Sequence, residues 1–150
     1  MKAVILISGN IDSGKSSTIR MIYRQLFFLQ NQHQFNGNPE TTLQIQNFAK
    51  GEDFYAVFPA IKGKRIGLIS GGDWLEEFQD IFNKVKKDID ILICASRSKN
   101  SPNSVYRFIV EELPRNSFGI KLNFSTFPTV SNEERTEMQQ NIAETVINTL

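Results

Sequence analysis

Residues 3–18 read AVILISGNIDSGKSST, and they place an apolar run directly before a glycine-rich turn. The run of five apolar residues from Ala3 to Ile7 predicts a buried parallel strand. Residues 9–16 match the pattern G-x-x-x-x-G-K-[ST], and a helix is expected from Lys15 onward. The two glycines let the backbone fold closely around an anion, toward which the free N–H groups of the turn and of the helix start point. This order of strand, turn and helix predicts a phosphate-binding loop.

Each position of the loop has an expected role. Lys15 places a positive charge near the outer phosphates of a nucleotide and is a candidate catalytic residue, and the Ser16 hydroxyl is a candidate ligand of Mg²⁺. The alternative is a glycine-rich turn that binds nothing. The residues expected to contact the nucleotide are Gly9, Asn10, Ile11, Asp12, Ser13, Gly14, Lys15, Ser16 and Ser17.

The chain resembles the P-loop NTPase superfamily, and residues 3–18 carry the specific match. The resemblance implies a small ATP-binding kinase or NTPase-like protein with ATP and Mg²⁺ as cofactors. Small GTPases carry D-x-x-G and N/T-K-x-D after later strands of the sheet. Here the corresponding positions read Ser70-Gly71-Gly72-Asp73 and Cys94-Ala95-Ser96-Arg97-Ser98-Lys99, so neither motif is present. Without the aspartate that selects guanine, ATP is the expected nucleotide.

Composition narrows the class of protein. The chain has 150 residues, 40% of them hydrophobic and 22% charged, which predicts a single domain over residues 1–150. The resemblance implies that this is a P-loop nucleotide-binding domain. Its net charge of +1 gives no clear nucleic-acid signature. No apolar run approaches the roughly 20 residues of a membrane span, so we expect a cytoplasmic protein without a membrane partner. Cys94, in an apolar run, is expected to be an inert buried thiol, and His33, the single histidine, is expected to be solvated.

Alternating helix and strand patterns predict the fold class. We expect a three-layer P-loop NTPase-like α/β fold, with helices on both faces of a mostly parallel sheet and one antiparallel edge strand supplied by a hairpin. The phosphate site should lie beyond the carboxyl ends of the central strands. Helices are predicted from Lys15 to Gln30, from Asp73 to Lys87, from Ser101-Pro102 to Leu113, and after the Ser131/Glu134 capping box. Strands are predicted over residues 3–7, 54–60, 65–70, 89–95 and 119–124. A further short strand is possible at Leu43 to Gln46.

Two charged residues outside the loop are candidates for the same site. Asp73 follows a strand and is a candidate magnesium ligand, but it is equally suited to cap the helix that it precedes, with Glu76 at the third helical position. Arg97 follows the strand 89–95, so it should project toward the nucleotide and stabilise charge on a transferring phosphoryl group. The alternative for Arg97 is a solvated loop residue. Thr41 and Thr42 are weaker candidates for a metal ligand.

Three functions agree with these patterns. The first is a Mg²⁺-dependent ATP-binding protein, a small kinase or an ATPase, that acts by phosphoryl transfer. The second is a nucleotide-dependent switch, similar to a GTPase, that contacts a partner protein through the polar segment after the first helix. The third is a nucleotide-binding module that does not turn over. The sequence does not name the phosphoryl acceptor or the partner protein.

Overall fold

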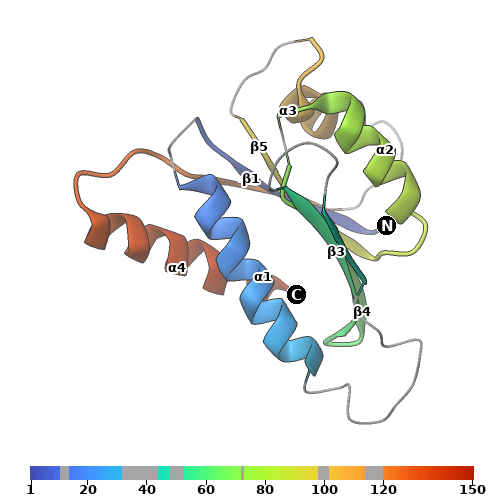
Figure 1. Ribbon diagram of the computed structural model, residues 1–150, viewed down its shortest axis with the longest axis horizontal. Coiled ribbons are helices and arrows are strands. Elements are labelled where there is room, and N and C mark those ends of the chain that lie inside the picture. Colours follow the sequence, from blue (N-terminus) through green and yellow to red (C-terminus); the bar gives the residue numbers. More distant parts are fainter. Residues whose placement is uncertain (11–13, 32–43, 48–52, 72, 98–101, 114–119) are drawn as a thin grey trace.

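The computed structural model describes residues 1–10, 14–31, 44–47, 53–71, 73–97, 102–113 and 120–150 (Figure 1). Predicted strands and helices alternate in it in the expected order. The strands are β1 (Ala3–Ser8), β2 (Gln44–Asn47), β3 (Phe54–Ile61), β4 (Lys64–Ile69), β5 (Ile91–Ser96) and β6 (Ile120–Ser125). The helices are α1 (Lys15–Asn31), α2 (Leu75–Val85), α3 (Val105–Arg107), which continues as the π-helical turn η3 (Phe108–Glu112), and α4 (Asn132–Thr149).

The six strands form one sheet in the order β2-β3-β4-β5-β1-β6. The pairs β4–β5, β5–β1 and β1–β6 are parallel, so the prediction of a mostly parallel sheet is confirmed. All six residues of β5 are buried, because this strand has parallel neighbours on both sides and helices over both faces. β5 is therefore an interior strand of the sheet.

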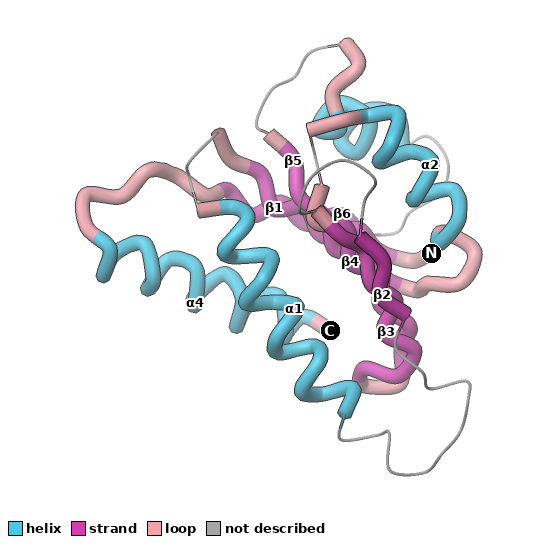
Figure 2. The backbone as a smooth tube through the Cα atoms, viewed as in Figure 1, coloured by secondary structure: helices cyan, strands magenta, loops and turns pink. Residues whose placement is uncertain are grey.

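The edge of the sheet differs from the prediction. β3 and β4 form the expected antiparallel hairpin, which turns at Lys62 and Gly63, both with positive φ. The edge strand is nevertheless β2, which pairs antiparallel with β3 and covers its outer side (Figure 2). Because β3 runs against β4, the first residue of β3 lies at the same end of the strands as the last residues of β4, β5 and β1. We call this end, where the parallel strands finish, the carboxyl edge of the sheet. This placement brings Asp53, just before β3, to that edge.

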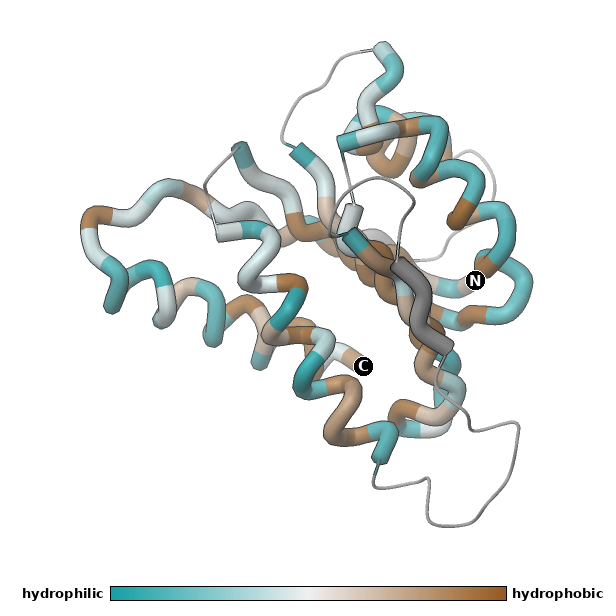
Figure 3. Tube along the Cα trace, viewed as in Figure 1, coloured by the Kyte–Doolittle hydropathy of each residue, from teal (hydrophilic) through white to brown (hydrophobic). Residues whose placement is uncertain are grey.

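Helices cover both faces of the sheet (Figure 1). The period of two in β1 sends Ile5 and Ile7 to the face covered by α1 and α4, and Val4 and Leu6 to the face covered by α2, α3 and η3. Hydrophobic residues are concentrated along the strands, whereas the helices carry hydrophilic residues as well (Figure 3). The three-layer arrangement follows from these two apolar faces.

The start of α2 differs from the predicted one by two residues. The predicted helix began at Asp73, but α2 begins at Leu75, and its N-cap is Trp74, which makes no side-chain capping hydrogen bond. Trp74 is also 60% exposed, so this N-cap residue does not belong to the core. The Asp73 side chain does not cap the helix because its carboxylate pairs with Arg97.

The third helix also starts later than predicted. Ser104 is the N-cap of α3 and its hydroxyl accepts a hydrogen bond from the Arg107 N–H, whereas Pro102 lies in a preceding turn. Asn103 has φ 67°, a left-handed conformation that interrupts any helix begun at Pro102. By contrast, the predicted cap of α4 is confirmed, since Ser131 Oγ accepts from the Glu134 N–H at 3.2 Å. None of the helices in the described ranges is long and apolar enough to cross a membrane.

Candidate functional site

The candidate phosphate loop follows β1 at the carboxyl edge of the sheet. Ser8 and Ser96, the last residues of β1 and β5, are in register, and the Gly9 N–H donates to the Ser96 carbonyl at 3.2 Å. The loop therefore starts between two central parallel strands, where ligands bind in open α/β sheets. Asn10 is exposed, and Ile11, Asp12 and Ser13, three of the expected nucleotide contacts, lie outside the described residues.

Gly14 ends the loop in a conformation that favours glycine. Its φ is +88°, and its carbonyl accepts from both the N–H and the hydroxyl of Thr18, at 3.0 and 2.8 Å. A Cβ at this position would lie 2.8 Å from Nε2 of Gln139, a buried residue of α4. The end of the loop is thus packed against α4, a contact that the sequence did not indicate.

Lys15 begins α1 with a side chain that is only 13% exposed. Burial lowers the pKa of Lys15, the charge of Arg97 lowers it further, and the charges of Asp73 and Asp53 oppose this decrease. A lysine whose charged form is poorly solvated gains from a bound anion, because the anion replaces part of the lost hydration. Ser16 and Ser17, in the same first turn, are exposed to solvent.

Asp73 lies between Lys15 and Arg97. Arg97 Nε donates to Asp73 Oδ1 at 2.9 Å, and Lys15 Nζ is 3.9 Å from the same oxygen. The side chains of Asp73 and Arg97 are 40% and 47% exposed, so both are open to a ligand. The structure thus brings together three residues that the sequence predicted for one site, and it shows that the capping interpretation of Asp73 is wrong.

Asp53 belongs to the same edge but was missed by the sequence analysis. Ser70 Oγ lies 3.4 Å from Asp53 Oδ1, and it accepts a hydrogen bond from the Phe54 N–H at 2.8 Å. Burial raises the pKa of the Asp53 carboxyl, and the negative charges of Asp73 and Glu77 raise it further. The position of Asp53 before an antiparallel strand is the signal that would have placed it here.

Cys94, Thr41, Thr42 and His33 were also considered in the sequence analysis. Cys94 is fully buried and burial raises its pKa, which confirms the expectation of an inert thiol. Thr41, Thr42 and His33 lie outside the described residues.

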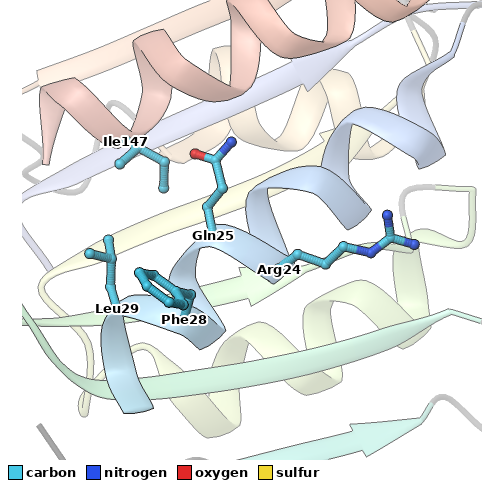
Figure 4. Close-up of a pocket in the computed structure, with 5 residues that line it drawn as sticks. All are labelled: Arg24, Gln25, Phe28, Leu29 and Ile147. Carbon is cyan, nitrogen blue, oxygen red and sulfur yellow. The ribbon is translucent and has the colours of Figure 1, made fainter. Parts of the chain in front are cut away.

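Two hollows lined by described residues lie away from the charged cluster. One, with a volume of about 320 Å³, lies between α1 and α4. Figure 4 shows Arg24, Gln25, Phe28 and Leu29 of α1 on one side of it and Ile147 on the other. Another, of about 520 Å³, lies at the opposite edge of the sheet beside Lys2, Lys62 and Lys64. Neither includes a predicted site residue.

The side chains at the loop fit a magnesium nucleotide. Mg²⁺ takes oxygen ligands and usually binds through one or two protein groups together with phosphates and water. The exposed hydroxyl of Ser16 and the carboxylate of Asp73 are such groups. Among the described residues, no three His, Cys, Asp or Glu side chains converge as a metal site. The Ser16 hydroxyl and the Asp73 carboxylate are oxygen donors of the kind that hold Mg²⁺ together with phosphates and water.

Comparisons with protein-family models, with curated proteins and with solved structures find no match to this chain.

Proposed function

We propose that this chain binds ATP with Mg²⁺ at residues 9–17 and acts by phosphoryl transfer, as a small ATPase or kinase of the P-loop class. The observation that supports the proposal most strongly is the meeting of Lys15, Asp73 and Arg97 beside Gly14. These three residues come from the start of α1, the segment before α2 and the end of β5. The loop pattern alone explains Lys15, but it does not require the other two to lie beside it.

Each group has a role that follows from its charge and position. Gly14 and the first N–H groups of α1 bind phosphate oxygens, toward which the positive end of the helix dipole points. Lys15 binds the outer phosphates as a point charge. Ser16 and Asp73 would hold Mg²⁺, which neutralises phosphate charge when bound. Arg97 stabilises the charge that develops on the transferring phosphoryl group.

A nucleotide-dependent switch is the second candidate, and the Asp73–Arg97 pair is the observation that favours it. Arg97 pairs with the carboxylate that would face the metal. Binding of a magnesium nucleotide would then require Arg97 to change partner. Hydrolysis accelerated by a partner protein would support the switch, whereas rapid multiple turnover with a small acceptor would support a kinase.

Calorimetry with ATP, with and without Mg²⁺, tests the proposal. Lys15→Ala should weaken ATP binding by about 1.5–3 kcal/mol, the magnitude of a charge-assisted hydrogen bond. Lys84→Ala is the matched control, because Lys84 is an exposed lysine in the last turn of α2. Equal affinity in the wild type and Lys15→Ala, or no ATP binding by the wild type, would refute the proposal. Binding without turnover would leave the non-catalytic module as the function.

A further inference from the structure

We propose that Asp53 is the general base of this site, which takes a proton from a water molecule as that water attacks the terminal phosphate of the bound ATP. The inference rests on the proposed nucleotide function and adds a catalytic residue to it. The loop pattern contains no such base. Asp53 has the position, the hydrogen bonding and the charged surroundings of one.

The position of Asp53 follows from the direction of β3. Because β3 is antiparallel to β4, its first residues lie beside the last residues of β4. Ser70 N donates to the Phe54 carbonyl at 2.9 Å, and Phe54 N donates to Ser70 Oγ at 2.8 Å. This pair of bonds anchors Asp53 at the carboxyl edge, where Lys15 and Asp73 also lie.

The Ser70 hydroxyl orients the carboxylate. Its oxygen accepts from Phe54 N, so its single hydrogen is available for Asp53 Oδ1, 3.4 Å away. Among the described residues, no other hydrogen-bond donor contacts the Asp53 carboxylate. One oxygen is thus held in place and the other remains available to accept a proton.

The surrounding charges make this carboxylate more basic than an exposed one. Burial, Asp73 and Glu77 raise the pKa of Asp53, while the bond from Ser70 and the charge of Lys15 oppose the increase. Oε2 of Glu77 is itself buried and has no hydrogen-bond partner in the described parts of the chain. A general base works best when its pKa approaches the working pH.

Asp53 and Asp73 have separate roles in this arrangement. Asp73 contacts Lys15 and Arg97, whereas Asp53 contacts Ser70. The described acidic side chains do not converge in the way that a metal site held by three protein groups requires. In this proposal Asp73, which contacts Lys15 and Arg97, would hold the metal, and Asp53 would accept the proton of the attacking water.

In the proposed step, water hydrolyses the bond between the γ-phosphorus and the bridging oxygen of ATP. The water oxygen forms a bond to the γ-phosphorus and loses one proton to the Asp53 carboxylate. The bond from the γ-phosphorus to the bridging oxygen breaks, and its electron pair leaves on ADP. Asp53 then releases the proton to solvent, so the products are ADP, inorganic phosphate and one proton.

Asp53→Asn in the full chain tests this role by two separate measurements. In single-turnover hydrolysis of ATP with Mg²⁺, the rate should fall roughly 10²–10⁴-fold, the usual contribution of a general base. ATP affinity measured by calorimetry should stay within about threefold, since the substitution removes no phosphate contact. Asp80→Asn, at an exposed position of α2, is the matched control and should change neither quantity.

The pH dependence separates a catalytic role from a structural one. The wild-type rate should rise with pH to a plateau, with a midpoint above the ordinary range of an aspartate, and Asp53→Asn should lose this rise. Ser70→Ala keeps the carboxylate but removes its hydrogen-bond donor, so the midpoint should move to higher pH while a measurable rate remains. This variant also keeps the test valid if Asp53→Asn folds poorly.

The outcomes distinguish the two proposals. If the wild type does not bind ATP, the nucleotide function fails and the role of Asp53 fails with it. If the wild type binds ATP but does not hydrolyse it, the general-base proposal is overturned and so is the ATPase, which leaves a kinase or a module that does not turn over. If Asp53→Asn hydrolyses ATP at the wild-type rate, only the general-base proposal is overturned. A loss of ATP affinity that higher Mg²⁺ concentration restores would instead make Asp53 a metal ligand and would also overturn the proposal.

Discussion

The carboxyl edge of the sheet and the opposite edge, beside the β3–β4 turn, use their charged side chains differently. At the edge beside the β3–β4 turn, the charged groups bind backbone atoms: Lys62 Nζ donates to the Ile147 carbonyl at 2.9 Å, and Asp90 Oδ2 accepts from the Arg65 N–H at 2.9 Å. At the carboxyl edge, Lys15, Asp73 and Arg97 bind one another across three segments.

This difference separates structural charges from candidate functional ones. At the carboxyl edge, burial lowers the pKa of Lys15 and raises that of Asp53. Charges held in a cluster that disfavours their ionised forms cost stability, and such clusters are typical of binding and catalytic sites. The following predictions test whether the two edges differ in this way.

The largest expected effect is at Asp73. Asp73→Ala and Asp73→Asn should both reduce the magnesium-dependent affinity for ATP well beyond tenfold, since the lost charge balances the metal. Stability should fall by less than about 1 kcal/mol, because the ion pairs of Asp73 are partly exposed. Affinity without Mg²⁺ should not decrease. Calorimetry and urea unfolding measure the two quantities.

Asp90→Ala is the matched variant at the opposite edge. It removes the acceptor of the Arg65 N–H and should cost about 0.5–1.5 kcal/mol of stability while leaving ATP affinity unchanged. If Asp73→Ala destabilised the fold more than Asp90→Ala and left the response to magnesium intact, Asp73 would be a structural residue and the contrast between the edges would disappear.

The next largest effect is expected from alanine substitutions at two glycines with positive φ, one at each edge of the sheet. Gly14 has φ +88° and Gly63 has φ +76°, so alanine at either position should cost about 1–2 kcal/mol of backbone strain. A Cβ at Gly63 meets nothing within 4 Å, whereas at Gly14 it displaces the Gln139 amide. Only Gly14→Ala should also weaken ATP binding, roughly tenfold or more if 1.4 kcal/mol of strain opposes the bound conformation.

Thermal melting and calorimetry on both glycine variants make this comparison. Similar melting temperatures with a loss of ATP binding only in Gly14→Ala are the expected result. A loss of ATP binding in Gly63→Ala would show that general destabilisation, and not the loop, controls affinity.

A smaller effect is expected in how the free energy of unfolding depends on pH, through the carboxyl group of Asp53. Because the pKa of Asp53 is higher in the folded state than in the unfolded one, the folded protein binds more protons between those two values. The contribution of Asp53 to stability should therefore decrease as pH rises through this interval and stay constant above it. Asp53→Asn should be more stable than the wild type near pH 7, and the difference should shrink toward pH 4. Unfolding by urea at several pH values measures it, and a difference that grows toward low pH would contradict the direction.

The smallest expected effect is the preference of the site for adenine or guanine in the bound nucleotide. The segment after β5 lacks the N/T-K-x-D pattern that selects guanine. ATP and GTP should therefore bind within about a hundredfold of each other, a difference below about 2.7 kcal/mol. Competition between the two nucleotides measures this ratio, and a stronger preference for GTP would favour the switch over the ATPase or kinase.

Prediction from the sequence succeeded for features determined by neighbouring residues. The apolar runs located β1 and β5, and the Ser131/Glu134 pair located the start of α4. It failed where a distant residue competes for a local group. Asp73 was expected to cap α2 as one of two alternatives, but its carboxylate pairs with Arg97 at the end of β5. The sequence pattern around Asp73 does not include Arg97, so it could not predict this ion pair.

The sequence by itself determined the periodicities of the strands and helices and the spacing of the candidate phosphate loop, because these depend on residues within a few positions of one another. Only the tertiary structure decided that β5 lies between β1 and β4, that β2 forms the edge, and that Asp53 reaches the carboxyl edge beside Lys15. The physical reason is that strand order and direction depend on pairings between distant segments, and these pairings set which charged side chains meet.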